Sequence, residues 1–527
     1  MHRSGLITIL VGTVILFSGC NKNRNHTPYS PPTPVNPPPI AVNDNFILVK
    51  NQVLDANTSS NDLISNDGKN IWQIKTEPEH GMLALRKDGT FSYTPENDYI
   101  GEDQFTYNIK DNEKISNMAT VTLNIKDGDV SFLIVVKTDK CQYDCTEDTQ
   151  FEIPTTGTGY NYSVDCNNDG INETTGESGN YICNYNEPGI YTIAIRGDFP
   201  QIYFNDAKDY TKLLTIKQWG SRKWRSFSNA FNKCSSMEEI NATDSPNLIN
   251  VTQMDGMFAY TDIFRGGITK WNTSKVTTMA GMFYATYHFN DNLNRWDTSH
   301  VTNMSQMFSF STAFNQDLNE WNTSNVTNME SLFSGASVFD GNISKWDTSH
   351  VANMNWMFSG ALQFNQNIGN WNTSSVTNMA TVFNRASSFN QDISRWDTSN
   401  VTTMDSMFML ASSFNQDLNN WDTSNVQWMG YMFSSASAFN GDISNWDTSN
   451  VVDMELMFQN ASAFNQDVSG WDTGNVKYMY GTFQNASGFS NHDLSGWNVA
   501  NVTDHDAFCD GWGENNIPPA DWTCTEK

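Results

Sequence analysis

A repeat of constant length dominates the second half of the chain and constrains its fold more than any other feature. The stretch "WDTSNVTTMDSMFMLASSFNQDLNN" covers residues 396–420. Residues 371–395 before it and residues 421–445 after it have a closely similar sequence. Tryptophan recurs at a constant interval, at positions 271, 296, 321, 346, 371, 396, 421, 446 and 471, and Trp497 follows one position late. A constant period of this length is typical of stacked repeats, because one short unit cannot bury its own apolar face.

The apolar residues of one unit predict a short helix followed by a short strand. Val301, Met304 and Phe308 follow the spacing of a helix face, and the polar "DTSH" before Val301 suits a helix N-cap. The stretch "NQDLNEW" resembles a short strand, with one central apolar residue and a terminal Trp. We therefore expect residues 251–508 to form an α/β solenoid of about ten 25-residue leucine-rich-like repeats, capped by residues 219–250 and 509–527.

The sequence of the repeats resembles that of a known family. Lines such as "WDTSNVTTMDSMF" and "ASAFNQDVSGWDT" are similar to BspA-like leucine-rich-repeat surface proteins, and in particular to the repeat first noted in mycoplasma lipoproteins. The resemblance implies a cell-surface protein engaged in adhesion, without a named ligand.

Two β modules are predicted before the repeats. Residues 41–127 contain short alternating runs such as "GMLALRKDGTFSYTP", in which Phe91 and Tyr93 share one face. This segment resembles bacterial cadherin-like, immunoglobulin-like modules, which implies a β-sandwich that acts as a spacer or adhesive unit. Residues 128–218 are expected to form a second small β domain. The predicted fold is thus multidomain, with all-β sandwich modules followed by the solenoid.

The N-terminus is typical of an exported lipoprotein. Residues 1–19 contain a short apolar core that ends in "LFSGC", which resembles a bacterial lipobox and implies lipidation of Cys20. An ordinary secretory signal remains the alternative. Residues 20–40 are rich in proline and are expected to form an extended or disordered stalk. We expect a lipid-anchored protein of the bacterial envelope, at the outer membrane or cell surface.

Charge and motifs exclude several functions. The formal net charge of −28 argues against a nucleic-acid partner, because phosphate binding needs a surface of Lys and Arg. The sequence has no GxSxG elbow, HExxH pair or Walker loop. We therefore expect no enzymatic activity and no resident cofactor. An enzyme with an unrecognised pocket, or the substrate-binding arm of one, is the remaining catalytic alternative.

The eight cysteines leave their pairing open. Cys166 with Cys183 and Cys509 with Cys524 are close enough in sequence to form local disulfides, which an exported protein permits. Cys141 with Cys145 would close a tight loop, and Cys234 would then be unpaired.

One loop has the spacing of a calcium site. Asp165, Asn167 and Asp169 alternate, Gly170 follows, and Glu173 falls at the ninth position. The twelfth position holds a glycine in place of the usual glutamate. Calcium binding and a metal-free Asx-rich turn both remain open.

The residue before each repeat Trp is one of the surface positions that vary from unit to unit, while the Trp and Val columns stay constant. We predict that these side chains face a ligand: Glu320, Lys345, Asn370, Arg395, Asn420 and Asn445. Columns of Asp and Asn, such as Asp397 with Asp422, are expected to be caps or turn residues rather than a ladder of bound cations. The predicted function is a binding or adhesion surface for extracellular protein or glycan ligands. The alternative is a structural surface coat without a foreign ligand.

Overall fold

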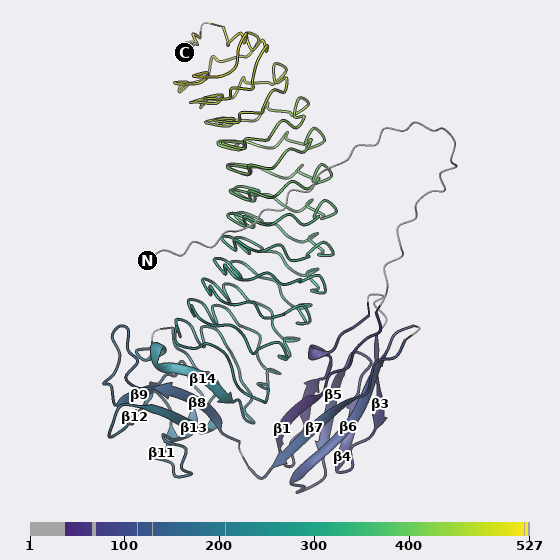
Figure 1. Cartoon of the computed structure of the whole chain (residues 1–527), viewed down its shortest axis with the longest axis vertical. Helices are drawn as coiled ribbons and strands as arrows, with labels where there is room; N and C mark the ends of the chain where they lie inside the picture. The colour runs from purple at the N-terminus through teal and green to yellow at the C-terminus, as the bar shows by residue number, and fades with distance from the viewer. Residues whose placement is uncertain are drawn as a thin grey trace, which may run out of the picture. The chain divides into compact units, whose positions relative to one another are not determined.

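The computed structural model describes residues 37–65, 70–112, 114–128, 130–205, 207–520 and 522–524. Figure 1 shows two regions of β-strands and a long series of stacked coils, coloured from teal to yellow. The predicted signal peptide, Cys20 and the greater part of the predicted stalk lie outside the described residues.

The first module is a two-layer β structure. A four-stranded sheet runs in the order β1–β7–β6–β3, and a three-stranded sheet in the order β2–β5–β4. The strands are β1 (Asp44–Val49), β2 (Leu54–Asn57), β3 (Ile71–Thr76), β4 (Gly81–Leu85), β5 (Thr90–Pro95), β6 (Gly101–Lys110) and β7 (Ala119–Lys126). A short 3-10 helix, η1, spans Ser59–Asn61. Phe91 and Tyr93 are fully buried, as their alternation predicts, so the immunoglobulin-like sandwich is confirmed.

The second module is also built from strands. Its larger sheet has the order β11–β10–β13–β8–β14, and β12 pairs with β9. The strands are β8 (Phe132–Lys137), β9 (Gln150–Ile153), β10 (Asn161–Asp165), β11 (Thr174–Glu177), β12 (Tyr181–Asn184), β13 (Ile190–Asp198) and β14 (Leu213–Gln218). A 3-10 helix, η2, spans Tyr210–Lys212. Buried residues from Phe132 to Cys509 form one continuous core, so this module and the coils pack as one body.

The prediction of an α/β solenoid of leucine-rich-like repeats is wrong. The only helices among the described residues are η1 and η2, and neither lies in the repeats. Each coil instead consists of consecutive turns, with a single residue in a parallel bridge to the next coil, as between Asn303 and Asn328. The predicted strand "NQDLNEW" does not form a regular strand either.

The predicted helix is absent because its backbone N–H groups bond to the neighbouring coil. The amides of Met304, Gln306 and Phe308 donate to carbonyl oxygens of the next coil, at distances of 3.1, 2.8 and 2.9 Å. Gln306 also has a φ of 58° and Phe310 a φ of 57°, and such left-handed residues interrupt an α-helix. Val301, Met304 and Phe308 are nevertheless fully buried, so the apolar face was identified correctly although its geometry was not.

Aromatic side chains stack from coil to coil through the core. The Phe383 ring lies 5.7 Å from Phe358 and 5.5 Å from Phe408 between centroids. Within its own coil it lies 3.9 Å from Phe389. Each coil thus buries its aromatic side chains against those of the neighbouring coils.

Buried polar groups are satisfied by the same stacking. The indole N–H of Trp396 donates to the Ile368 carbonyl at 3.1 Å. The hydroxyl of Thr398, which is 1% exposed, donates to the Asp422 carbonyl at 2.8 Å. Equivalent bonds recur in the other coils, for example from Trp421 and Thr423. These ladders explain why Trp and Thr return at every repeat: each side chain bonds to a backbone carbonyl of another coil.

The Thr398→Val variant is expected to be less stable by about 1 kcal/mol, because it removes the hydroxyl of a buried side chain that donates to the Asp422 carbonyl. Thr402→Val is the matched control. The Thr402 hydroxyl also bonds to a neighbouring coil, at 3.2 Å to the Thr377 carbonyl, but it is exposed and water can replace it. Urea unfolding of both variants checks the prediction, and equal losses would contradict it.

Candidate functional site

The six predicted ligand-facing residues all have exposed side chains: Glu320, Lys345, Asn370, Arg395, Asn420 and Asn445. We call this set the exposed row. The Trp that follows each of them is only 2–4% exposed, and it holds the backbone against the core. The backbone N–H of Lys345 also donates to Asn319 Oδ1 of the preceding coil at 2.9 Å. The side chains are therefore presented at regular intervals from an ordered backbone.

Charges of opposite sign meet within the exposed row. Lys345 Nζ lies 2.9 Å from Glu320 Oε1 of the preceding coil. Both side chains are substantially exposed, so the pair contributes little to stability. The row carries no catalytic constellation of base, nucleophile and orienting group. Its arrangement suits many weak polar contacts to a large partner.

The Asp columns cap turns. Asp397 Oδ1 accepts hydrogen bonds from the Ser399 amide at 3.1 Å and the Ser399 hydroxyl at 2.6 Å. These bonds hold the pKa of Asp397 below its usual value. The same pairing recurs at Asp422 with Ser424. The carboxylates therefore act as local backbone caps, as the sequence predicts.

The loop with calcium-like spacing is closed by its own hydrogen bonds. Asp165 is fully buried, and its two oxygens accept the Asp169 amide at 3.1 Å and the Gly170 amide at 2.9 Å. Asn167 Oδ1 also accepts the Asp169 amide, and Glu173 Oε2 accepts the Cys166 amide at 2.6 Å. Among the described residues, no group of three or more His, Cys, Asp or Glu side chains is arranged to hold a metal ion. Calcium binding by this loop stays a prediction.

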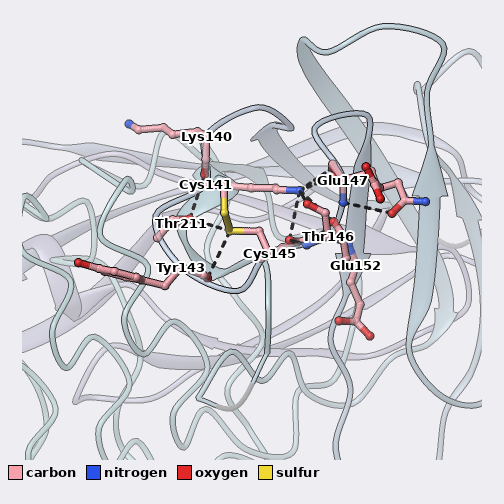
Figure 2. Close-up of a disulfide and its surroundings, with 11 residues drawn as sticks. Lys140, Cys141, Tyr143, Cys145, Thr146, Glu147, Glu152 and Thr211 are labelled. Carbon is pink, nitrogen blue, oxygen red and sulfur yellow. Dashed lines mark hydrogen bonds and ion pairs between the residues drawn. A yellow bond between two sulfur atoms is a disulfide. The ribbon is translucent and has the colours of Figure 1, made fainter.

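Three disulfides join cysteines of the described region. They are Cys141–Cys145, Cys166–Cys183 and Cys509–Cys524. Cys234 is free and fully buried, and burial raises the pKa of its thiol. Figure 2 shows the Cys141–Cys145 loop beside Thr211, with Thr146 and Glu147 on the segment that follows it.

A buried ion pair next to this loop was not predicted from the sequence. Lys212 Nζ lies 3.2 Å from Asp209 Oδ1, and both side chains are fully buried. Lys212 Nζ also donates to the Thr146, Glu147 and Gln150 carbonyls at 2.9–3.1 Å. Asp209 accepts the Thr146 and Glu152 amides at 3.0 and 2.7 Å. The pair therefore ties η2 to residues 146–152. In the sequence, the stretch "DYTK" that contains Asp209 and Lys212 has no feature that distinguishes this buried ion pair from one on the surface.

A second unpredicted feature is a group of acidic side chains on two coils that are separated by one other coil. Asp405, Asp453 and Glu455 lie close enough to repel one another, and Tyr431 donates to Glu455 Oε1 at 3.0 Å. Gly430 permits this approach, because a Cβ there would lie 2.7 Å from Asp405 Oδ1. Burial, followed by the charges of Asp453 and Glu455, raises the pKa of Asp405 from 3.8 to about 6.

This shift predicts a loss of stability with rising pH. Between the ordinary value of 3.8 and about 6, the folded chain holds a proton on Asp405 more tightly than the unfolded chain does. Unfolding therefore releases a proton, and stability falls as pH rises through this window. Asp405→Asn should flatten the dependence, as measured by urea midpoints at about pH 4.5 and about pH 6.5. Asp397→Asn is the control, because the pKa of Asp397 is lowered and its contribution is lost only on acidification below the ordinary value. An unchanged slope in Asp405→Asn would contradict the prediction.

Among the described residues, no helix is long and apolar enough to span a membrane.

Comparison with known families assigns two parts of the chain. The profile described as "Mycoplasma protein of unknown function, DUF285" matches residues 225–344, 328–440 and 416–522, which together cover more than half of the 527 residues. The bacterial Ig domain profile matches residues 36–124. No curated protein matches the chain. The predicted Ig-like module and mycoplasma-type repeats are thus confirmed, whereas the BspA-like leucine-rich assignment is not. The combination suggests a protein of the cell surface or envelope.

Proposed function

We propose that this chain, which belongs to the mycoplasma repeat family of unknown function that matches residues 225–522, is a lipid-anchored surface protein. Its coils would present a binding surface for extracellular protein or glycan ligands. Cys20 would carry the lipid, and the proline-rich segment would separate the folded modules from the membrane. The adhesive role is the one implied by the BspA-like resemblance, on coils that do not have a leucine-rich-repeat fold.

The exposed row is the observation that carries the binding proposal. Its side chains change from coil to coil in size and charge, as in Glu320, Lys345 and Asn370, while the Trp beside them stays constant and buried. A stack of coils needs the buried columns for stability, but it does not need variable exposed residues. Packing does not constrain these side chains, so they are free to recognise a partner on a constant scaffold.

We further propose that the protein has no catalytic activity, no nucleic-acid partner and no resident cofactor. Polar side chains of the coils recur in columns with capping roles, as Asp397 and Thr398 do. A catalytic site requires a unique arrangement of groups in a pocket, which a repeated column does not supply. The net charge of −28 repels nucleic-acid phosphates.

A binding assay tests the role of the exposed row. The full chain is applied to an array of immobilised extracellular glycoproteins and free oligosaccharides, beside the triple variant Glu320→Ala, Lys345→Ala and Arg395→Ala. We expect saturable binding that the triple variant loses. The control variant, Lys75→Ala with Glu77→Ala, removes exposed charges from the Ig module and should bind normally. Self-association alone, without any bound ligand, would contradict the proposal and favour a surface coat.

A further inference from the structure

An open hollow lies where the second β module meets the first coils. Its volume is about 450 Å³, and its lining includes Tyr143, Tyr210, Tyr260, Gln142, Asn232 and Lys233. The module and the coils share one continuous core, so residues far apart in sequence are held together at this place. None of the described side chains that line it is a carboxylate.

Two aromatic rings of the hollow are exposed although they are anchored in ordered backbone. Tyr143 is 69% exposed and lies within the disulfide loop Cys141–Cys145. Figure 2 shows its side chain projecting away from the disulfide. Tyr260 is 51% exposed. Core packing therefore does not explain why these positions carry large aromatic side chains.

The left-handed backbone at Tyr260 belongs to the repeat. Its φ is 59°, and the same repeat position also has a positive φ in later coils, for example at Phe310 and Leu410. Two coils carry glycine there, at Gly335 and Gly360, with φ of 70° and 72°. Replacement of Tyr260 by glycine should therefore leave the fold intact.

The same hollow contains an unsatisfied buried acceptor. Asn232 is 5% exposed, and its Nδ2 donates to Asn229 Oδ1 at 3.3 Å and to the Gly256 carbonyl at 3.2 Å. Its Oδ1 is buried and accepts no hydrogen bond from the described residues. Buried polar atoms are normally paired. This oxygen has almost no accessible surface of its own, so it would accept a ligand hydroxyl only after the Asn232 side chain shifts toward the hollow.

A second hollow extends the first along the coils. It has a volume of about 300 Å³, shares Tyr260 and is also lined by Tyr284 and Gln306. The Tyr284 ring lies 5.2 Å from Tyr260 and 5.8 Å from Phe310 between centroids, and Phe310 is 45% exposed. Aromatic side chains therefore continue over adjoining coils beyond the first hollow. A ligand of several linked rings fits this strip better than a single small molecule does.

We propose that this strip, from Tyr143 through Tyr260 to Phe310, binds a neutral oligosaccharide. Aromatic faces pack against the C–H faces of sugar rings, while amide groups such as Asn232 and Gln142 pair with sugar hydroxyls. Among the described residues that line the two hollows, Lys233 is the only one with a charged side chain. Together with the net charge of −28, this composition disfavours acidic glycans. The strip uses other repeat positions than the exposed row, so it does not depend on the proposed function of that row.

An oligosaccharide array tests the inference. The full chain is applied to defined neutral, sialylated and sulfated oligosaccharides, beside the variants Tyr143→Ala and Tyr260→Gly. Glycine suits the left-handed backbone, so Tyr260→Gly should fold normally. We expect at least one neutral oligosaccharide to bind, and each variant to weaken it by about ten-fold or more. Tyr478→Ala, which removes a 40% exposed ring from a distant coil, should leave binding unchanged.

Three results would overturn the inference: no neutral oligosaccharide binds, only acidic ones bind, or both variants bind as the unaltered chain does. The triple variant of the exposed row is measured in parallel. Sugar binding that is lost there and kept in Tyr143→Ala and Tyr260→Gly would sustain the proposed function and reject the aromatic strip. Binding lost only in the two strip variants supports the strip independently of the row.

Discussion

Replacing Phe383 by alanine is expected to destabilise its coil by about 3–5 kcal/mol, the usual range for removing a fully buried phenylalanine. The ring is 0% exposed and contacts aromatic rings of its own coil and of both neighbouring coils. Its loss leaves a cavity that the neighbouring rings cannot fill without losing their own stacking contacts. The effect should therefore spread to the adjoining coils.

Hydrogen exchange is the suitable measurement, because a long array of repeats need not unfold in a single step. Amides of the coils around Phe383 should lose protection in Phe383→Ala, while the Ig module should keep its own. Arg395→Ala is the control, since an exposed side chain of the same region should change stability by no more than about 0.5 kcal/mol. A loss below about 1 kcal/mol in Phe383→Ala would contradict the view that the stacked rings form the core.

Replacing Lys212 by methionine is expected to cost about 3–5 kcal/mol, because it leaves the Asp209 carboxylate buried without its cation. The apolar double variant Lys212→Met with Asp209→Leu should regain part of this loss, since it removes the unpaired charge as well. Thermal unfolding checks both expectations. The segment that follows the Cys141–Cys145 loop should be the first to open, because Lys212 bonds to its carbonyls.

Lys345→Met provides the matched control for the buried pair. It breaks the ion pair with Glu320, but both partners are exposed, so the change should stay within about 1 kcal/mol. Equal losses in Lys212→Met and Lys345→Met would show that burial does not decide the strength of these pairs in this protein.

Some parts of the fold can be predicted from the sequence, whereas others cannot. Alternation in "TFSYTP" predicts that Phe91 and Tyr93 are buried, because strand faces alternate along the chain itself. The constant column of Trp likewise predicts the stacked core. The prediction of a helix within each repeat was wrong, because the spacing of Val301, Met304 and Phe308 also suits a coil of turns. The hydrogen bonds that decide between the two conformations run to the neighbouring coil rather than within the segment.

The turn positions gave no indication of this backbone either. Residues at one left-handed position of the repeat include Gln306, Ser331, Trp356 and Thr381, rather than the glycine that usually marks such a backbone. The exposed row was predictable, because in a turn the residue directly before a buried Trp faces outward. The buried Asp209–Lys212 pair and the hollow at Tyr143, Asn232 and Tyr260 were not, since packing between distant segments creates both.

Protease accessibility on intact cells measures whether the coils are displayed at the cell surface. Trypsin is added outside, and an antibody against residues 219–508 follows the fragment. We expect a large fragment to be released from unbroken cells, through cleavage near Lys22 and Arg24 in the predicted stalk. Protection of the full chain until the outer barrier is opened would place the coils inside the envelope and contradict surface display.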